Sequence, residues 1–137
     1  MISVEERKQS LTPGKVGELS RMVIDTLGLN LRSGQAIFLG ETNIQHMLKR
    51  HPAAYHRYAY ALPEILSEPD YVGLNPKDGS LEYVREFQWD NEYVKVAVRV
   101  SGSGNLYARS LYTLNRQRVQ NFIVNGALKK PLTKPTE

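Results

Sequence analysis

The feature that most constrains the fold is a change in hydrophobic period after residue 70. From there to residue 114, apolar and polar residues alternate with a period of two, in segments rich in Val, Tyr, Leu and Phe. Such alternation is typical of β-strands. The predicted strands are YVGL (71–74), LEYVREF (81–87), YVKVAVRVS (93–101) and NLYARSLYTL (105–114). Because NPKDGS, WDNE and SGSGN between them are turn compositions, the segment predicts a four-stranded antiparallel sheet.

Helical patterns precede and follow these strands. Residues 11–29 predict a helix with Thr12 as N-cap, Pro13 at the first helical position and Gly28 at the end. Residues 36–40 (AIFLG) predict a short buried strand. Residues 41–51 predict a helix capped by Thr42 or Asn43 and closed by Pro52, and 52–70 a helical stretch broken near Pro63. Residues 115–126 predict a last helix with Asn115 as its N-cap.

This order of elements predicts an α+β fold, with N-terminal helices packed on the four-stranded antiparallel sheet and a C-terminal helix. A length of 137 residues is sufficient for one domain with its own core. We place that domain at residues 13–126, with flexible ends at 1–12 and 127–137.

Composition narrows the class of protein. The absence of cysteine excludes disulfides and cysteine-metal sites. No apolar run reaches the ~20 residues of a membrane span, and the N-terminus lacks the apolar core of a secretory signal, so we expect a cytoplasmic protein with no membrane partner. The net charge of +4 and the pI near 9.4 are compatible with a polyanionic partner but do not identify one.

Two histidines, His46 and His51, lie on the helix predicted at residues 41–51. At ~100° per residue, His51 falls on the apolar side, whereas His46 points nearly the opposite way, so the two imidazoles do not converge from this helix alone. Their spacing of five does not suit a two-histidine zinc motif, and we predict no metal site. They are either surface and capping residues or general acids and bases, because imidazole titrates near neutrality.

The predicted strands carry a second set of candidates. In YVKVAVRV the valines form one face, and the opposite face carries Tyr93, Lys95 and Arg99. In LYARSLYTL neither face is purely apolar, so Arg109 or Ser110 must point toward an apolar surface or into a cleft. Cations and hydroxyls beside histidine suit phosphate chemistry, although tyrosine and arginine are also common on the wet face of a sheet. The acidic residues of this region have the pattern of solvated strand edges: Glu82, Glu86, Asp90 and Glu92.

Residues from AIFLG to FIVNG resemble a known family. The resemblance rests on HMLKRHPAAYHRYAYALPEILSEPDYVG, YVKVAVRVSGSGNLYARSLYTLN and RVQNFIVNG. These segments are similar to the phage-associated group of the barnase, EndoU, colicin E5/D and RelE-like (BECR) nuclease superfamily. The resemblance implies helices on a four-stranded antiparallel sheet, together with RNA cleavage that needs no metal or cofactor. In that reaction the 2′-hydroxyl attacks the adjacent phosphate, so DNA is not a substrate.

The resemblance also implies roles for particular residues. His46 and His51 match the family's histidine positions, and Arg109, Ser110 and Tyr112 match its late-strand motif. One histidine would act as acid or base, Arg109 would stabilise phosphate charge, and the two hydroxyl side chains would position the phosphate. The predicted RNA-binding residues are Lys95, Arg99 and Tyr93.

The sequence is compatible with three functions. The leading hypothesis is a toxin-type endoribonuclease from a phage or mobile element that acts on tRNA or another structured RNA, with an immunity or antitoxin protein as a possible partner. The alternative is a non-catalytic module that binds nucleic acid or a host protein through a basic sheet face. A third is an immunity or structural protein with an incidental basic charge.

Overall fold

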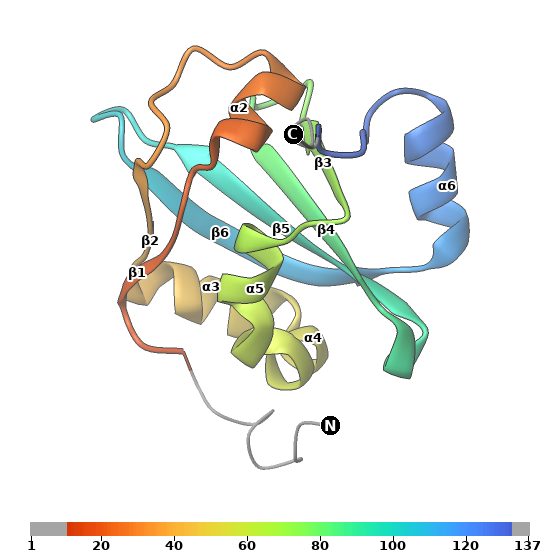
Figure 1. The fold of residues 1–137 in the computed structure, drawn as a ribbon. Coiled ribbons are helices and arrows are strands. Elements are labelled where there is room, and N and C mark those ends of the chain that lie inside the picture. The colour runs from red at the N-terminus through yellow and green to blue at the C-terminus, as the bar shows by residue number, and fades with distance from the viewer. Residues whose placement is uncertain (1–10, 133–137) are drawn as a thin grey trace.

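The computed structural model describes residues 11–132, and its centre is one mixed β-sheet (Figure 1). The six strands lie in the order β1-β2-β6-β5-β4-β3. The elements in chain order are β1 (Gly14–Glu18), α2 (Arg21–Leu27), β2 (Ala36–Leu39), α3 (Glu41–Arg50), α4 (Pro52–Tyr58), the 3₁₀ helix η1 (Ala59–Ala61), α5 (Leu62–Ser67), β3 (Tyr71–Leu74), β4 (Leu81–Phe87), the 3₁₀ helix η2 (Gln88–Asp90), β5 (Glu92–Val100), β6 (Leu106–Leu114) and α6 (Arg116–Val124).

The α+β class is confirmed. The predicted four-stranded antiparallel sheet is present, but it is only part of a larger sheet. Strands β3 to β6 form the expected antiparallel meander. Strand β2 then pairs in parallel with the start of β6, and β1 pairs antiparallel with β2. These additions make the sheet six-stranded and mixed, because the predicted strand at 36–40 completes its hydrogen bonds against β6 rather than lying apart from the meander.

The predicted helix at residues 11–29 is wrong in its first half, where β1 lies. Two glycines in this short segment weaken helix formation, and pairing with β2 satisfies the backbone instead. At Gly17 an added Cβ would lie 3.2 Å from Leu66 Cδ1, so the strand packs closely on α5. The helix begins only after Ser20, whose Oγ accepts a hydrogen bond from the Val23 N–H at 3.2 Å. Its end at Gly28, in the left-handed conformation, is as predicted.

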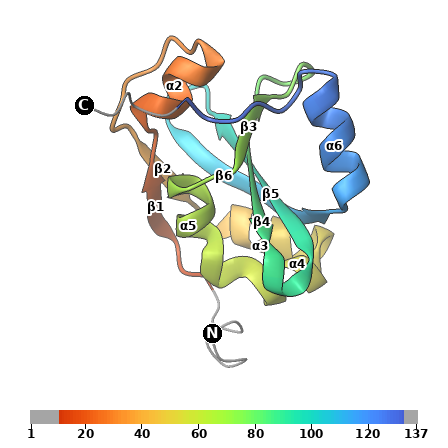
Figure 2. The same cartoon turned by 45° about the vertical axis from the view of Figure 1, so that its right-hand side comes forward.

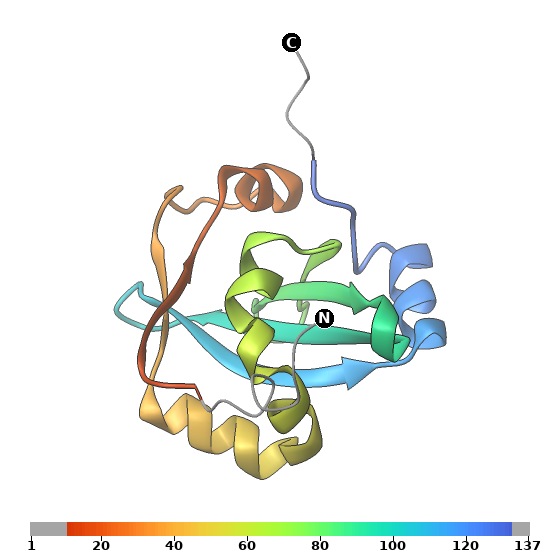
Figure 3. The same ribbon diagram turned by 60° about the horizontal axis from the view of Figure 1, so that its bottom comes forward.

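Helices cover both faces of the sheet. Figure 2 shows α5 and α6 on opposite sides of the strands. The face toward α5 and α2 bounds the main core, which includes Tyr58, Ile65 and Tyr83, each fully buried. The face toward α6 holds a smaller cluster around Val84, Leu114 and Val119. Helices α3 and α4 lie along the edge of β6 that β2 leaves free (Figure 3).

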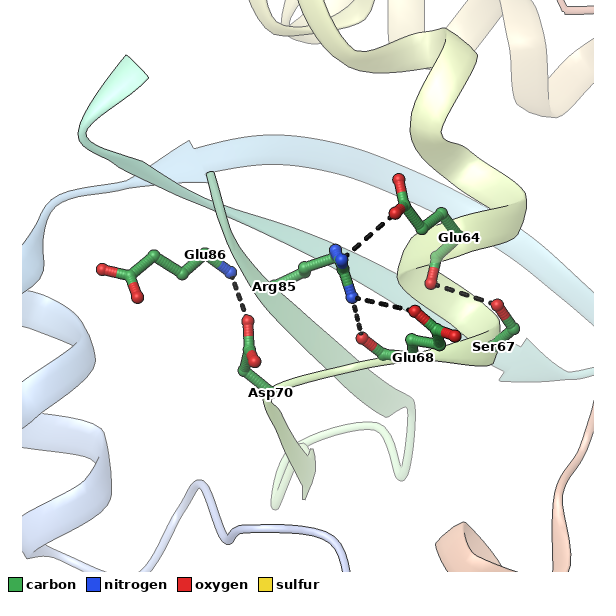
Figure 4. Close-up of polar contacts among 6 residues, drawn as sticks. All are labelled: Glu64, Ser67, Glu68, Asp70, Arg85 and Glu86. Carbon is green, nitrogen blue, oxygen red and sulfur yellow. Dashed lines mark hydrogen bonds and ion pairs between the residues drawn. The ribbon is translucent and has the colours of Figure 1, made fainter. Parts of the chain in front are cut away.

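Polar contacts around Arg85 hold the turn between α5 and β3 against β4 (Figure 4). The guanidinium of Arg85 lies 3.1 Å from a Glu64 carboxylate oxygen and also donates to the Glu68 carbonyl. One residue further on, the backbone N–H of Glu86 donates to an Asp70 carboxylate oxygen at 2.7 Å. These contacts lie where β3 begins its pairing with β4, since Tyr71, the first residue of β3, is the register partner of Val84.

The chain after α6 returns to the sheet beside β3. The sequence places Ala127 to Lys129 in a flexible tail, whereas in the structure Leu128 is buried and Lys129 exchanges two backbone hydrogen bonds of 2.8 Å with Val72. The approach is close enough that a Cβ added at Gly73 would lie 2.1 Å from the Ala127 carbonyl oxygen. Residues 1–10 and 133–137 of the predicted flexible ends lie outside the described residues.

Candidate active site

Strand β6 contains a β-bulge at Arg109. Ala97 of β5 faces Ser110 and the next residue, Val98, faces Ala108, which leaves Arg109 as an extra residue in β6. A bulge re-aims a side chain relative to strict alternation. Arg109 and Ser110 accordingly line the same cleft, whereas Ala108 before them is fully buried. The conflict that the sequence indicates in LYARSLYTL is therefore resolved by backbone geometry, and both polar side chains face the cleft.

The cleft is a hollow of about 300 Å³ on the face of the sheet that also carries α6. Helix α3 borders it on one side and the turn between β3 and β4 on the other. Its lining is largely polar and comes from five segments of the chain: His46, Arg50, Asn75, Asp78, Ser80, Glu82, Ala97, Arg109, Ser110 and Tyr112. Three of the five residues predicted to be catalytic are in β6, and His46 joins them from α3.

The N-cap of α3 lies two residues before Thr42 and three before Asn43, the two predicted caps. Gly40 is the N-cap, and its N–H donates to Asn43 Oδ1 at 2.8 Å, so Asn43 caps from inside the helix. Pro52, predicted to close this helix, is also the first residue of α4. The loop between β2 and α3 is thereby reduced to one residue, which sets α3 directly beside β6.

The predicted orientation of His51 is wrong, whereas His46 lies off the buried stripe of α3, as predicted. Ile44 and Met47 of α3 are buried, as expected, but α3 lies at the edge of β6. The half-buried side of α3 that carries His46 therefore lies toward the face of the sheet that carries α6, and His46 lines the cleft there. His51, expected on the apolar side, is exposed. Its ring stacks on Tyr112, with centroids 4.9 Å apart and planes at 26°. Both histidines thus approach β6, and only His46 is part of the cleft lining.

Glu82 and Lys95 form a buried ion pair at the floor of the cleft. The ammonium Nζ of Lys95 lies 2.6 Å from Glu82 Oε2. It also lies 5.5 Å from the ring centroids of both Tyr112 and Phe122, within cation–π range. Burial acts to lower the pKa of Lys95, but hydrogen bonding to Glu82 and Tyr112 and the nearby negative charge outweigh it, so the pKa is raised.

Sequence reasoning missed Glu82, which it assigns to a solvated strand edge. A usable signal was present in the strand register. Glu82 pairs with Ala97 and Val84 pairs with Lys95, so Glu82 and Lys95 are diagonal neighbours on one face of β4 and β5. Asn75 adds a longer contact of 3.4 Å from its amide nitrogen to the Glu82 carboxylate. The buried carboxylate is therefore positioned from two sides.

The turn between β3 and β4 places Asp78 at the rim of the cleft. The Ser80 N–H donates to Asp78 Oδ1 at 2.9 Å. Hydrogen bonds from Ser80 lower the pKa of the Asp78 carboxyl, and the charges of Arg99 and Arg109 lower it further. Asp78 is exposed, so this carboxylate is a solvated counter-charge to the two arginines rather than a structural anchor.

The three predicted RNA-binding residues have different environments. Arg99 is exposed and lines a second hollow beside the cleft. Lys95 is buried in its pair with Glu82, as described above. Tyr93 is 5% exposed in the cluster under α6, and its ring lies 5.9 Å from the Arg116 guanidinium. Of the three, Arg99 is the one at the surface.

Two further findings concern the part of the chain that the structure describes. Within residues 11–132, no group of three or more His, Cys, Asp or Glu side chains is arranged to hold a metal ion. No helix in that range is long and apolar enough to cross a membrane.

The fold and cleft define a small α+β protein whose polar cleft combines a histidine with two arginines. Residues 14–121, most of the chain, match the family model described as phage-Barnase-EndoU-ColicinE5/D-RelE like nuclease3 (PBECR3). The chain therefore belongs to this phage-associated nuclease family, and the resemblance seen in the sequence is confirmed. No curated protein and no solved structure matches the chain.

Proposed function

We propose that this protein is a metal-independent endoribonuclease that cleaves RNA by 2′-hydroxyl attack in the cleft between α3 and β6. The observation that carries the proposal is the joint lining of this cleft by His46 and Arg50 of α3 and by Arg109 and Ser110 of β6. A proton-transfer group, phosphate-binding cations and a hydroxyl donor are the parts that such a reaction requires.

The reaction breaks the bond between phosphorus and the leaving 5′-oxygen, and forms a bond from the 2′-oxygen to the same phosphorus. A base accepts the 2′-hydroxyl proton, and an acid gives a proton to the leaving oxygen. The products are a 2′,3′-cyclic phosphate and a free 5′-hydroxyl. DNA lacks the nucleophile, which is the reason for proposing an RNA substrate.

We assign proton transfer first to His46, because it lines the cleft whereas His51 contacts the site only through its stacking on Tyr112. Glu82 is the second proton-transfer candidate, since a carboxylate in the cleft can accept the 2′-hydroxyl proton. His51 is then a positioning residue that packs on the Tyr112 ring.

The remaining lining residues have electrostatic roles in this proposal. Arg109 and Arg50 stabilise the charge that develops on the phosphoryl oxygens. Ser110 and Tyr112 donate hydrogen bonds that hold the phosphate in place. Lys95 keeps positive charge beneath Glu82 and Tyr112 without itself meeting the RNA.

We further propose a toxin role, with tRNA or another structured RNA as the target and an immunity or antitoxin protein as partner. Membership of a phage-associated nuclease family supports this part of the proposal. A freely active ribonuclease harms the cell that makes it, so expression of the wild-type chain should be poorly tolerated unless such a partner is present.

The test is to incubate the purified chain with total tRNA in excess chelator, and to read the RNA on a denaturing gel. The wild-type chain should release discrete fragments, and His46→Ala and Arg109→Ala should release none. Arg21→Ala, at an exposed arginine of α2 paired with Asp25, is the matched control and should cleave like the wild type. Intact RNA with salt-sensitive binding would instead favour the non-catalytic binding module.

A further inference from the structure

A second hollow lies next to the cleft and shares Arg109 with it. Its volume is about 170 Å³, and its lining residues come from α3, β5 and β6 and from the turn after β5: Asn43, Arg99, Ser101, Tyr107 and Arg109. Because one guanidinium borders both hollows, a ligand in the second hollow would be adjacent to a ligand in the cleft.

The strand residues around this hollow lie on the same face of the sheet as the cleft, on three neighbouring strands. Arg99 of β5 is the register partner of Tyr107 in β6, and Tyr107 is the partner of Phe38 in β2. The rings of Phe38 and Tyr107 are 6.1 Å apart between centroids, with planes at 44°. Their neighbours Ile37 and Ala108 are fully buried, whereas both rings are partly exposed. An aromatic pair thus lies beside two arginines at the surface.

We propose that this hollow is a nucleotide subsite next to the scissile phosphate, with Phe38 and Tyr107 as the stacking platform for an unpaired base. Arg99 and Arg109 bind the phosphate that joins this nucleotide to the one in the cleft. The inference rests on the proposed function, since it assumes that the cleft holds a phosphodiester of RNA.

The chemistry and the spacing of the subsite both fit a single strand. Sites for single strands combine a positively charged groove with aromatic side chains on which bases stack. Along β6, Tyr107 and Tyr112 are separated by roughly 16 Å, which is five residues at ~3.3 Å per residue. A mononucleotide in the cleft does not reach across that length, whereas an oligonucleotide does. The RNA therefore follows a path that runs from the cleft across β6 toward β2.

Asp78 lines the cleft and not the second hollow, but it lies near both arginines of the proposed subsite. Its carboxylate is close enough to Arg99 and Arg109 for their charges to lower its pKa. A bound phosphate would take over this role as counter-charge. Because Asp78 is exposed and belongs to a turn, it can move away from the arginines when RNA enters.

The experiment measures binding of two all-2′-O-methyl oligonucleotides, a dinucleotide with a single phosphate and an octamer, which lack the attacking hydroxyl. The wild-type chain should bind the octamer about tenfold or more tightly than the dinucleotide, because the subsite adds a stacked base and a phosphate contact. Tyr107→Leu should lose most of that gain. Arg99→Gln, at an exposed side chain, should lower the slope of log affinity against log salt by about 0.7. Arg21→Gln removes the same charge from α2 and should change neither quantity.

Two results would overturn the subsite: equal affinity of the wild-type chain for dinucleotide and octamer, or a gain in affinity for the octamer that Tyr107→Leu and Arg99→Gln both retain. Cleavage of unmodified tRNA by the wild-type chain, measured in parallel, judges the proposed function separately. If the wild-type chain does not cleave tRNA but binds the octamer more tightly, the ribonuclease is rejected and the subsite is kept. If it cleaves tRNA but binds the octamer no more tightly, the ribonuclease is kept and the subsite is rejected.

Discussion

The Lys95 ammonium lies 2.6 Å from a Glu82 carboxylate oxygen, and the two side chains are only 10% and 9% exposed. Lys95 lies against the Tyr112 ring and Glu82 lines the cleft, so this ion pair links the stability of the sheet to the geometry of the site. A buried pair of this kind is held by the mutual attraction of its members, and removal of one leaves an uncompensated charge in a poorly solvated place.

Glu82→Gln should therefore destabilise the protein by about 3 kcal/mol, and Lys95→Met should act in the same direction. The double variant Glu82→Gln with Lys95→Met should lose less unfolding free energy than the two single variants lose together, because no charge is then left unpaired. Urea unfolding of the four proteins measures this coupling. Purely additive losses would show that the pair contributes nothing beyond its separate residues.

The raised pKa of Lys95 also predicts an alkaline dependence of stability. In the unfolded chain this ammonium titrates at its ordinary pKa of 10.5, and in the folded protein the pKa is higher. The stabilisation is thus fully present below pH 10.5 and is lost as the pH rises through the folded pKa. The difference in unfolding free energy between wild type and Lys95→Met should shrink between neutral pH and strongly alkaline pH. A constant difference would contradict the raised pKa.

The two histidines should separate clearly in activity. His46→Ala is expected to lower kcat/KM for RNA cleavage by roughly 100-fold or more, as is typical for loss of a general acid or base. His51→Ala removes only a ring stacked on Tyr112 and should lower it less than tenfold. His51→Phe keeps a stacking ring and should recover most of that smaller loss. The reverse order of effects would move the proton-transfer role to His51.

A stability prediction concerns the C-terminal segment on β3. Gly73→Ala should destabilise the protein by about 1–3 kcal/mol, because the new Cβ would lie 2.1 Å from the Ala127 carbonyl oxygen. Gly102→Ala is the matched control, since nothing lies within 4 Å of a Cβ there. Thermal melting of both variants provides the comparison. Equal melting temperatures would mean that the segment after α6 moves away from β3 at no appreciable expense.

The sequence predicted the elements whose signal is local. Alternation identified β3 to β6, and Asn115 identified the start of α6. Elements defined by distant partners were missed. Strand β1 contains two glycines and resembles the start of a helix, and it is a strand because β2 pairs with it. The parallel pairing of β2 with β6 likewise has no signature in either segment.

The candidate site shows the same difference between what local sequence predicts and what depends on distant partners. Residue types together with the family resemblance selected His46, Arg109, Ser110 and Tyr112, which the cleft brings together. The place of His46 in the cleft lining could not be predicted, because it depends on α3 packing at the edge of β6 rather than on its face. The shared direction of Arg109 and Ser110 depends on a bulge that strict alternation does not include.

The measurement that tests the central claim most directly is the chemistry of the new 3′ end. A defined RNA that the wild-type chain cleaves is incubated in chelator, beside the same RNA with a single 2′-deoxy nucleotide on the 5′ side of the cleaved bond. The account predicts a 2′,3′-cyclic phosphate by mass spectrometry from the first RNA, no cleavage of that bond in the second, and no product from His46→Ala. Cleavage of the deoxy-substituted bond would contradict attack by the 2′-hydroxyl.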